Sequence, residues 1–485
     1  MMLKGLFLHV FAKVVFVLST YIIHMYLGKT LLPEEYGIIG VVISIISVNY
    51  NFLSNGTRQA MSRLLASKQF DEQNLIRRGI LCQAAVAFAL TLLNYLGANY
   101  ISEALNAPEM EGYIKLSAVM IPFTAGYFLC VGTLNGLKLF VIESIIVTIY
   151  PLLRLSIIPY VAYLFKDSAA ATVMGFMTAA IVCCVGSAGY LFMHRKQLVK
   201  RERIVDKKTF LANITNFLLF FSCVTIILNI DMLFVNAYVK NQSHVGFYTG
   251  AVNFAKVSYY LLSAIYIVVL PVITQYYANK EIAKALETIK TLGNTIGLLI
   301  LPIVCIVGAT AGNMLAVFYK PEYIYAATAT TILMFSQFSI GLFVVLNMCI
   351  SATGDSRFSS VLSVSITGLN IILCFFLVDI LGIEGAAISS CITGFTGCIF
   401  SYLKLTKLFS NSIDFTTIKL IIYNFILYYI TKKINNMITP VSLISILEFY
   451  AIVYFTFIGI MIFTKQVDIK KILKILSKNN ESTSL

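Results

Sequence analysis

The sequence is poor in charge and has no tryptophan. Lys, Arg, Asp and Glu make up 12% of its 485 residues, whereas a soluble globular domain carries about 25%. Hydrophobic residues make up 59%, and the mean hydropathy is +0.86. This composition excludes an ordinary soluble protein and indicates a lipid environment. Because tryptophan is absent, tyrosine is the residue left to form the aromatic belt at the membrane interface.

The motifs of common enzymes are missing as well. The sequence contains no G-x-x-x-x-G-K-[ST] phosphate loop, no H-E-x-x-H zinc motif and no G-x-S-x-G turn. The ten cysteines lie within or beside apolar stretches, where they act as small buried hydrophobes, and their spacing predicts neither a zinc site nor a disulfide framework. We therefore expect no metal, no cofactor and a transporter rather than an enzyme.

What the sequence does contain is a series of apolar stretches of about 20 residues, the length that a helix needs to cross a bilayer. We count fourteen, approximately 7–27, 37–57, 79–101, 114–136, 143–165, 170–193, 209–236, 246–270, 290–312, 325–350, 359–379, 383–403, 416–434 and 443–464. The pattern predicts an all-α polytopic membrane protein with about 14 transmembrane helices.

Positive charge alternates from loop to loop. The loops 56–78 and 194–208 and the C-terminal tail are rich in Lys and Arg, whereas the loop 102–113 holds three glutamates and no cation. Because basic loops stay in the cytoplasm, both termini are predicted to be cytoplasmic. The net charge of +14 then reflects this topology and contact with anionic lipids, and we expect no nucleic-acid partner.

A shift of 209 residues superposes two halves of the chain. Polar residues at steps of three and four share one helical face in the second span: Ser44, Ser47, Asn51, Ser54 and Arg58. The shift carries this face onto that of the eighth span: Asn253, Lys256, Tyr260 and Ser263. The first and seventh spans hold a second pair of polar faces: Lys13, Thr20 and His24, and Ser222, Thr225, Asn229 and Asn236.

This pattern indicates a parallel repeat, since six spans separate the matching stretches. It predicts two six-helix lobes, 1–193 (first to sixth spans) and 209–410 (seventh to twelfth), joined by a basic cytoplasmic linker at 194–208. The segment 411–485 adds two C-terminal helices and a basic cytoplasmic tail. Transporters built from such repeats carry their substrate between the halves, near the bilayer midplane.

Several stretches are similar to those of a known family. They are YLGKTLLPEEYGIIG (26–40) with SNGTRQAMSRLLAS (54–67), the stretch 229–277 that begins NIDMLFVNAY, and GIEGAAISSCITG (382–394). Over roughly residues 1–410 the chain resembles the polysaccharide flippases of O-antigen and exopolysaccharide repeat units, which belong to the multidrug/oligosaccharidyl-lipid/polysaccharide exporter superfamily. The resemblance implies a central cavity that opens alternately to each side, an undecaprenyl-diphosphate-linked sugar as substrate, and the bacterial inner membrane as location.

Lys256 is the only charged residue between Asn241 and Asn279. A lysine inside a membrane span costs a few kcal/mol, so something should compensate it. Two interpretations stay open. Lys256 either faces the cavity and balances the diphosphate of the substrate, or forms a structural pair with a carboxylate such as Asp231.

The other cations within the spans receive similar alternatives. Lys13 lies on the polar face of the first span, which favours a role in the cavity. Arg154 either lines the cavity or bridges neighbouring helices. Arg58 ends the polar face of the second span near the cytoplasmic mouth, where it either meets the head group or reaches to lipid phosphate as an ordinary interfacial arginine. The predicted cavity residues are Lys13, Thr20, Ser47, Asn51, Arg58, Arg154, Asn229, Asn253, Lys256 and Tyr260.

Two further residues are candidates for ion coupling or a structural pair. Asp231 is the acidic residue that the sequence predicts to be buried in the seventh span. The resemblance implies that an acidic residue at this position is common in the family. In a continuous helix it points half a turn away from Asn229, and only a broken helix removes that objection. His24 lies on the face of Lys13 and is either titratable near neutral pH or simply hydrogen-bonded.

We therefore predict a flippase for a lipid-linked oligosaccharide, with bilayer lipids and other polysaccharide assembly proteins as partners. A multidrug or cation antiporter of the same superfamily is one alternative, and it needs acidic residues in the cavity. A flippase for the peptidoglycan lipid precursor is another, and it shares the diphosphate chemistry. A membrane-bound polysaccharide polymerase or ligase is disfavoured, because the outer loops have only about ten to twenty residues.

Overall fold

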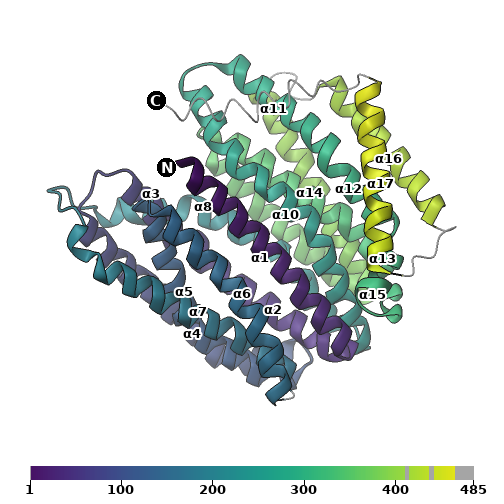
Figure 1. Ribbon diagram of the computed structural model, residues 1–485, viewed down its shortest axis with the longest axis horizontal. Coiled ribbons are helices and arrows are strands. Elements are labelled where there is room, and N and C mark those ends of the chain that lie inside the picture. The colour runs from purple at the N-terminus through teal and green to yellow at the C-terminus, as the bar shows by residue number, and fades with distance from the viewer. Residues whose placement is uncertain (1, 166, 410–413, 436–441, 465–485) are drawn as a thin grey trace. The chain divides into compact units, whose positions relative to one another are not determined.

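The computed structural model describes residues 2–165, 167–409, 414–435 and 442–464, and within these ranges the chain is helical and contains no strand (Figure 1). Within these described ranges, ten helices are long and apolar enough to cross a membrane. The chain is therefore a multi-pass membrane protein, and the prediction of an all-α polytopic fold is confirmed. The count of fourteen spans is not confirmed and stays a prediction.

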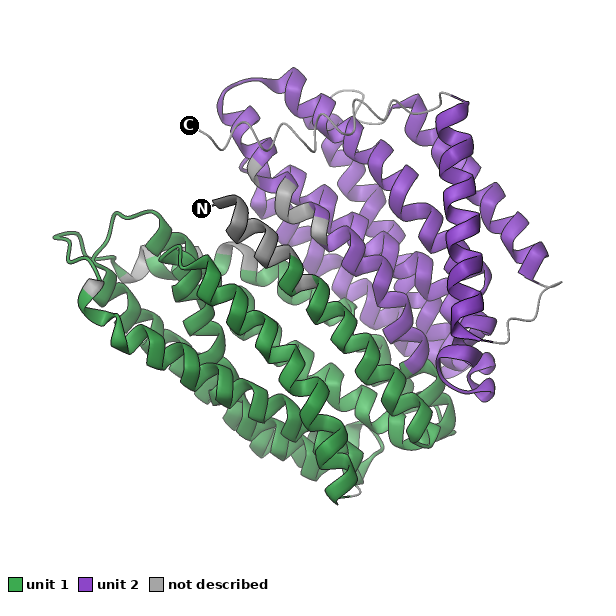
Figure 2. Cartoon of the chain, viewed as in Figure 1, with its two compact units in different colours: residues 1–249 green, residues 250–485 purple. Residues whose placement is uncertain are grey.

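The chain forms two compact units, Met1–Thr249 and Gly250–Leu485 (Figure 2). Unit 1 holds α1 (Met2–Thr30), α2 (Pro33–Asn55), α3 (Thr57–Ala66), α4 (Glu72–Ala104), α5 (Glu111–Gly136), α6 (Phe140–Phe165), α7 (Ser168–Met193), α8 (Lys207–Ile227), α9 (Ile230–Tyr238) and the N-terminal end of α10 (Gln242–Ala278). The boundary between the units lies within α10. The predicted lobes are defined by the sequence repeat, whereas the two units are defined by compactness. The lobe boundaries therefore stay a prediction.

The described part of unit 2 holds the rest of α10 and seven further α-helices. They are α11 (Ile282–Thr295), α12 (Leu301–Ala309), α13 (Ala311–Phe318), α14 (Ala327–Ala352), α15 (Ser356–Leu408), α16 (Phe415–Asn435) and α17 (Leu443–Phe463). A π-helical segment, Ile296–Ile300, joins α11 to α12.

The helix α15 contains two of the predicted spans. Its backbone is non-helical at Gly382, where φ is 59° and ψ is −131°. This left-handed region favours glycine, so the kink falls between the predicted spans 359–379 and 383–403. Across the kink, Asn370 Nδ2 donates a hydrogen bond to Thr393 Oγ1 at 3.1 Å. Asp355 directly precedes α15, and Lys404 near the other end of α15 lies 2.7 Å from its carboxylate. This hydrogen bond holds the pKa of Asp355 below its usual value.

The loop predicted at 56–78 contains a short helix, α3, that packs closely against α5. A Cβ atom added at Gly132 would lie 2.6 Å from the backbone oxygen of Arg58, and one added at Gly136 would lie 3.0 Å from that of Met61. Glycines one turn apart let two helices approach closely inside a membrane. These two glycines therefore set the position of α3 and of the Arg58 side chain that it carries.

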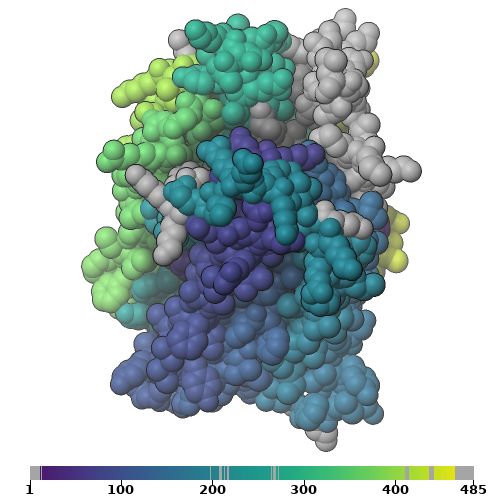
Figure 3. Space-filling view, turned by 90° about the vertical axis from the view of Figure 1, so that its left-hand side faces the viewer, coloured from purple at the N-terminus to yellow at the C-terminus, as the bar shows by residue number. Residues whose placement is uncertain are grey.

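Residues 198–206 of the predicted linker, which we call the linker strap, lie on the surface of unit 1 beside α3. Figure 3 shows teal side chains near residue 200 against the purple ones near residue 60. Val205 is buried in the same hydrophobic cluster as Met61 and Phe70. The linker strap is therefore an ordered part of unit 1.

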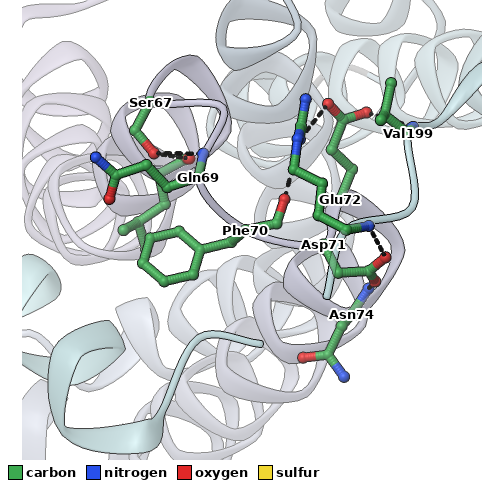
Figure 4. Close-up of polar contacts among 9 residues, drawn as sticks. Ser67, Gln69, Phe70, Asp71, Glu72, Asn74 and Val199 are labelled. Carbon is green, nitrogen blue, oxygen red and sulfur yellow. Dashed lines mark hydrogen bonds and ion pairs between the residues drawn. The ribbon is translucent and has the colours of Figure 1, made fainter. Parts of the chain in front are cut away.

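Two carboxylates at the start of α4 hold the linker strap (Figure 4). Arg201 Nη1 lies 3.0 Å from Glu72 Oε1, and the backbone N–H of Val199 donates to Glu72 Oε2 at 3.0 Å. Asp71 accepts from the backbone N–H of Arg201 at 3.2 Å, and its own N–H donates to the Arg203 oxygen at 2.9 Å. Each carboxylate thus acts as a clasp for the linker strap.

We expect Glu72→Ala to release the linker strap. The variant loses two hydrogen bonds to a charged group, each worth about 1.5–3 kcal/mol. Tryptic cleavage within residues 198–206 should therefore become several-fold faster in membranes. Glu202→Ala is the matched control, because Glu202 lies exposed in the same segment and both variants keep every tryptic site. Equal cleavage rates in the two variants would contradict a clasp.

Candidate functional site

In each predicted repeat a titratable side chain fastens the first span to the second. His24 Nδ1 lies 2.9 Å from Tyr36 Oη, which joins α1 to α2. Tyr248 Oη donates to Asp231 Oδ2 at 2.8 Å, which joins α9 to α10. His24 is 3% exposed and Asp231 is 0% exposed. Both residues thus have a hydrogen-bonding role within unit 1.

The seventh predicted span is broken, and the break explains the position of Asp231. The helix α8 ends at Ile227 and α9 begins at Ile230, so Asp231 lies in the first turn of α9. Its Oδ1 accepts from the backbone N–H of Met232 at 2.8 Å. A carboxylate at this end is favoured by the helix dipole. Because the helix is broken, the half-turn between Asn229 and Asp231 that a continuous helix would impose no longer applies.

The polar face of the second predicted span meets that of the seventh predicted span at Asn51. Asn51 Nδ2 donates to Ser222 Oγ at 3.2 Å, and Asn55 donates to Asn51 Oδ1. Two other predicted cavity residues bond within their own helices: Thr20 donates to the oxygen of Phe16, and Ser47 to that of Ile43. Asn229 lies in the break between α8 and α9 and donates back to the oxygen of Thr225 in α8.

Arg154 lies in α6 among aromatic rings. Its Cζ lies 3.7 Å from the ring centroid of Phe176 on α7 and 5.9 Å from those of Phe16 on α1 and Tyr150. The residue is 4% exposed, and its Nε has no hydrogen-bond partner within the described part of the chain. A desolvated cation over rings gains about 2 kcal/mol or more. Arg154 therefore bridges three helices and still has an N–H group to offer.

The remaining predicted cavity residues are either half-buried or have side chains outside the described part of the structure. Arg58 lies on α3 rather than α2, with its Cζ 5.8 Å from the ring centroid of Phe128 on α5. Lys13 is part of α1, but its side chain lies outside the described residues. In unit 2, the side chains of Asn253, Lys256 and Tyr260 are half-buried on α10.

The pair of Lys256 with Asp231 stays a hypothesis. Lys256 belongs to unit 2 and Asp231 to unit 1, and each unit is described by itself. The same holds for a cavity between the predicted lobes. Over the described ranges, no group of three or more His, Cys, Asp or Glu side chains could hold a metal ion.

Sequence reasoning missed a second buried acid. Glu143 is 1% exposed at the start of α6, and its Oε2 accepts from Asn135 Nδ2 at 2.8 Å. Asn135 in turn accepts from Ser62 Oγ at 2.6 Å, which connects α3, α5 and α6. The sequence placed Glu143 at the edge of a span, where an exposed carboxylate is ordinary. The signal that could have found it is Asn135, a polar residue eight positions earlier in the turn NGLKLF.

Comparisons with known proteins place this fold among transporters. The Lipid II flippase MurJ, in an inward closed conformation, has a TM-score of 0.68 at 14% identity, covering 96% of this chain and 99% of that chain. A multidrug resistance MATE family transporter of the MOP superfamily, facing inward, has a TM-score of 0.63 at 14% identity, covering 82% and 95%. At these identities the likeness shows the fold.

A third similar structure is a MOP superfamily transporter from Pyrococcus furiosus, described as having a binding pocket of reverse polarity that suggests a different function. Its TM-score is 0.62 at 14% identity, and the match covers 84% of this chain and 96% of that chain. No curated protein matches the sequence.

Two families match the sequence itself. The MatE family matches residues 217–376, and the polysaccharide biosynthesis protein family matches residues 2–277. Because the second match spans more than half of the 485 residues, this chain belongs to the polysaccharide biosynthesis protein family.

Proposed function

We propose that this protein is a flippase that carries an undecaprenyl-diphosphate-linked oligosaccharide across the bacterial inner membrane by alternating access. The observation that carries the proposal is membership of the polysaccharide biosynthesis protein family. The transporter fold supports it, since the similar structures include both a flippase and a multidrug resistance transporter. The sugar unit, of the O-antigen or exopolysaccharide type, moves through the cavity while the lipid tail stays in the bilayer.

The charges of unit 1 support an anionic substrate. Arg154 keeps an Nε–H without a hydrogen-bond partner in the described part of the chain. Each buried acid accepts a hydrogen bond through at least one oxygen: Asp231 from Tyr248, Glu143 Oε2 from Asn135 and Glu72 from Arg201. A cation-rich site attracts anions such as a diphosphate. A multidrug or cation antiporter instead needs acids that can hold a cation, and these three already accept hydrogen bonds.

A flippase for the peptidoglycan lipid precursor is the second candidate. The observation that favours it is the match to MurJ, which covers 96% of this chain and 99% of that one. Both candidates handle a lipid-linked diphosphate, so they differ in the sugar that accumulates when the protein is missing. Partner proteins of polysaccharide assembly belong to the first candidate only.

The test uses cells that lack this chain. Lipid-linked oligosaccharides are extracted, and the proposal expects complete repeat units to accumulate while surface polysaccharide is lost. Accumulation of the peptidoglycan precursor would favour the second candidate. A change in drug tolerance without any lipid-linked intermediate would overturn the proposal in favour of an exporter. Unchanged lipid-linked pools with short surface chains would favour a polymerase or ligase.

In the same cells Lys256→Ala should complement poorly. We expect transport to fall about tenfold or more, because a lost contact to a charged group is worth about 1.5–3 kcal/mol and 1.4 kcal/mol is a factor of ten. Lys256→Arg should restore most of the activity, since it keeps the positive charge. Lys407→Ala, at the exposed end of α15, is the control. Full complementation by Lys256→Ala at normal expression would remove Lys256 from the site.

A further inference from the structure

The ninth predicted span is broken by a π-helical turn that ends at a proline. The span consists of the end of α11, the π-helical segment and α12. In this segment the N–H of Leu301 donates to the oxygen of Ile296, five residues earlier. The next residue is Pro302, which has no N–H. The oxygen of Gly297 therefore lacks the backbone donor that the same register would give it.

The oxygen of Gly297 accepts a hydrogen bond from the thirteenth predicted span instead. Asn424 Nδ2 on α16 donates to this oxygen at 2.8 Å, and also to the oxygen of Leu420 in its own helix at 2.8 Å. Asn424 is 0% exposed. A carbonyl oxygen without a donor is costly inside a membrane, because lipid supplies no hydrogen bond. Asn424 thus takes the place of the N–H that Pro302 lacks.

The fourteenth predicted span contacts the same broken helix. Tyr454 Oη on α17 donates to the oxygen of Leu299, within the π-helical segment, at 3.1 Å. One turn earlier on α17, the hydroxyl of Tyr450 bonds with that of Thr310, which directly follows α12. Both C-terminal helices therefore hydrogen-bond to the ninth predicted span.

Two glycines let α16 come close to the break. A Cβ atom added at Gly293 would lie 3.2 Å from Thr417 Oγ1, and one added at Gly297 would lie 3.2 Å from Leu420 Cβ. Thr417 Oγ1 also donates to Asn294 Oδ1 at 2.7 Å. Glycines one turn apart allow close helix packing inside a membrane. The helix α16 therefore lies near enough for its side chains to reach backbone oxygens of the broken span.

The third predicted span, which the repeat relates to the ninth, is built differently. It runs through α4, which is one continuous helix without a proline. Phe88 and Leu93 on α4 are 70% and 65% exposed, so this helix presents an apolar face to lipid. The proline break and the helices that cover it thus occur together in the second half of the chain.

We propose that α16 and α17 form a hydrogen-bonding brace that stabilises the π-helical break of the ninth predicted span, with Asn424 supplying the donor that Pro302 lacks. The proposal assigns a role to the two helices that lie outside the predicted repeat. It is independent of the proposed function, because every contact that carries it lies within unit 2. A break inside lipid is tolerated where neighbouring helices satisfy the freed backbone groups.

The experiment returns the missing N–H to the backbone. Asn424→Leu removes the side-chain donor at similar volume, and Pro302→Ala restores a backbone N–H. In the π-helical register this N–H reaches the Gly297 oxygen, and in an α-helical register the N–H of Leu301 reaches it. Either way Gly297 gains a backbone donor, so Asn424 is no longer needed. The melting temperature of monodisperse full-length protein in detergent is measured for both single variants and the double variant.

We expect Asn424→Leu to lower the melting temperature by several degrees, because it leaves a buried oxygen without a donor. In the Pro302→Ala background the same substitution should cost only a small part of that loss, which is the non-additivity of two residues that serve one oxygen. An equal loss in both backgrounds would overturn the brace. A native melting temperature for Asn424→Leu would overturn it as well.

Thr417→Val is the matched control. Thr417 also joins α16 to α11, but its acceptor is the side chain of Asn294, which Pro302→Ala does not affect. Its loss of stability should therefore be the same in both backgrounds. If Pro302→Ala rescued Thr417→Val as well as Asn424→Leu, its effect would be a general stabilisation and the proposal would fail.

A milder variant covers the case in which Asn424→Leu does not fold. Tyr454→Phe removes one hydroxyl and keeps the ring, so the oxygen of Leu299 loses its donor from α17. Backbone hydrogen exchange over residues 296–306 should become several-fold faster than in the native protein, while exchange in α4 stays unchanged. Unchanged exchange over residues 296–306 would contradict a stabilising role of α17.

Discussion

Gly132→Leu is expected to remove most of the folded protein, whereas Gly186→Leu is tolerated. A Cβ atom at Gly132 would lie 2.6 Å from the backbone oxygen of Arg58 and 2.9 Å from its Cα. Backbone atoms cannot rotate away as a side chain does, so α3 and α5 must separate. Overpacking of this kind costs about 1–3 kcal/mol and occasionally more, and here it moves the helix that carries Arg58 and Ser62.

The measurement is the amount and thermal stability of monodisperse protein extracted in detergent. Gly186 is the matched control, because it lies inside α7 and a Cβ atom there meets nothing within 4 Å. Gly132→Ala should give an intermediate result, since its single methyl group still meets the α3 backbone. Equal yield and melting temperature for Gly132→Leu and Gly186→Leu would show that α3 does not depend on this contact.

Asp231→Ala is expected to lose both stability and transport, and Asp231→Asn to retain most of both. The alanine variant deprives the buried Tyr248 hydroxyl of its acceptor and the first turn of α9 of its bond to Met232. Removing a partner from a buried polar group costs about 1–3 kcal/mol. Asparagine keeps an oxygen that can accept from Tyr248, although it removes the charge.

The two variants separate the structural role of Asp231 from ion coupling. Thermal stability in detergent and complementation of surface polysaccharide are measured together. If Asp231→Asn is as stable as the native protein but does not transport, then the charge itself is required and Asp231 couples transport to an ion. If Asp231→Ala is as stable as the native protein, the link between α9 and α10 contributes little. Tyr248→Phe is the matched partner, since it removes the hydroxyl alone.

The helical part of the fold could be predicted because hydropathy is a local property. Each apolar stretch must satisfy its backbone hydrogen bonds internally once it enters lipid, and no distant residue is needed to specify that. The break at Gly382 also follows from a local cause, since its positive φ suits glycine. The break between α8 and α9 was harder to predict, because no proline or glycine marks residues 228 and 229.

The sequence could predict which polar residues share a helix face, but not which of them contact each other in the candidate site. Steps of three and four placed Asn51 and Ser222 on polar stripes, but their hydrogen bond joins residues 171 positions apart. Glu143 looked interfacial because its partner Asn135 lies across a turn on another helix. That Arg154 bridges helices could not be predicted, because Phe176 and Phe16 beside it lie on other helices.

By itself, the sequence determined that this protein is a helical membrane protein of the polysaccharide biosynthesis type, because composition, span length and motifs are read along the chain, and it predicts an internal repeat. Tertiary structure alone decided that Arg154 lies among aromatic rings, that the linker strap is clasped to α4, and that Gly37 meets Gly246. The physical reason is the same in each case. A buried polar or glycine residue is stable only with a particular neighbour, and that neighbour comes from a distant part of the chain.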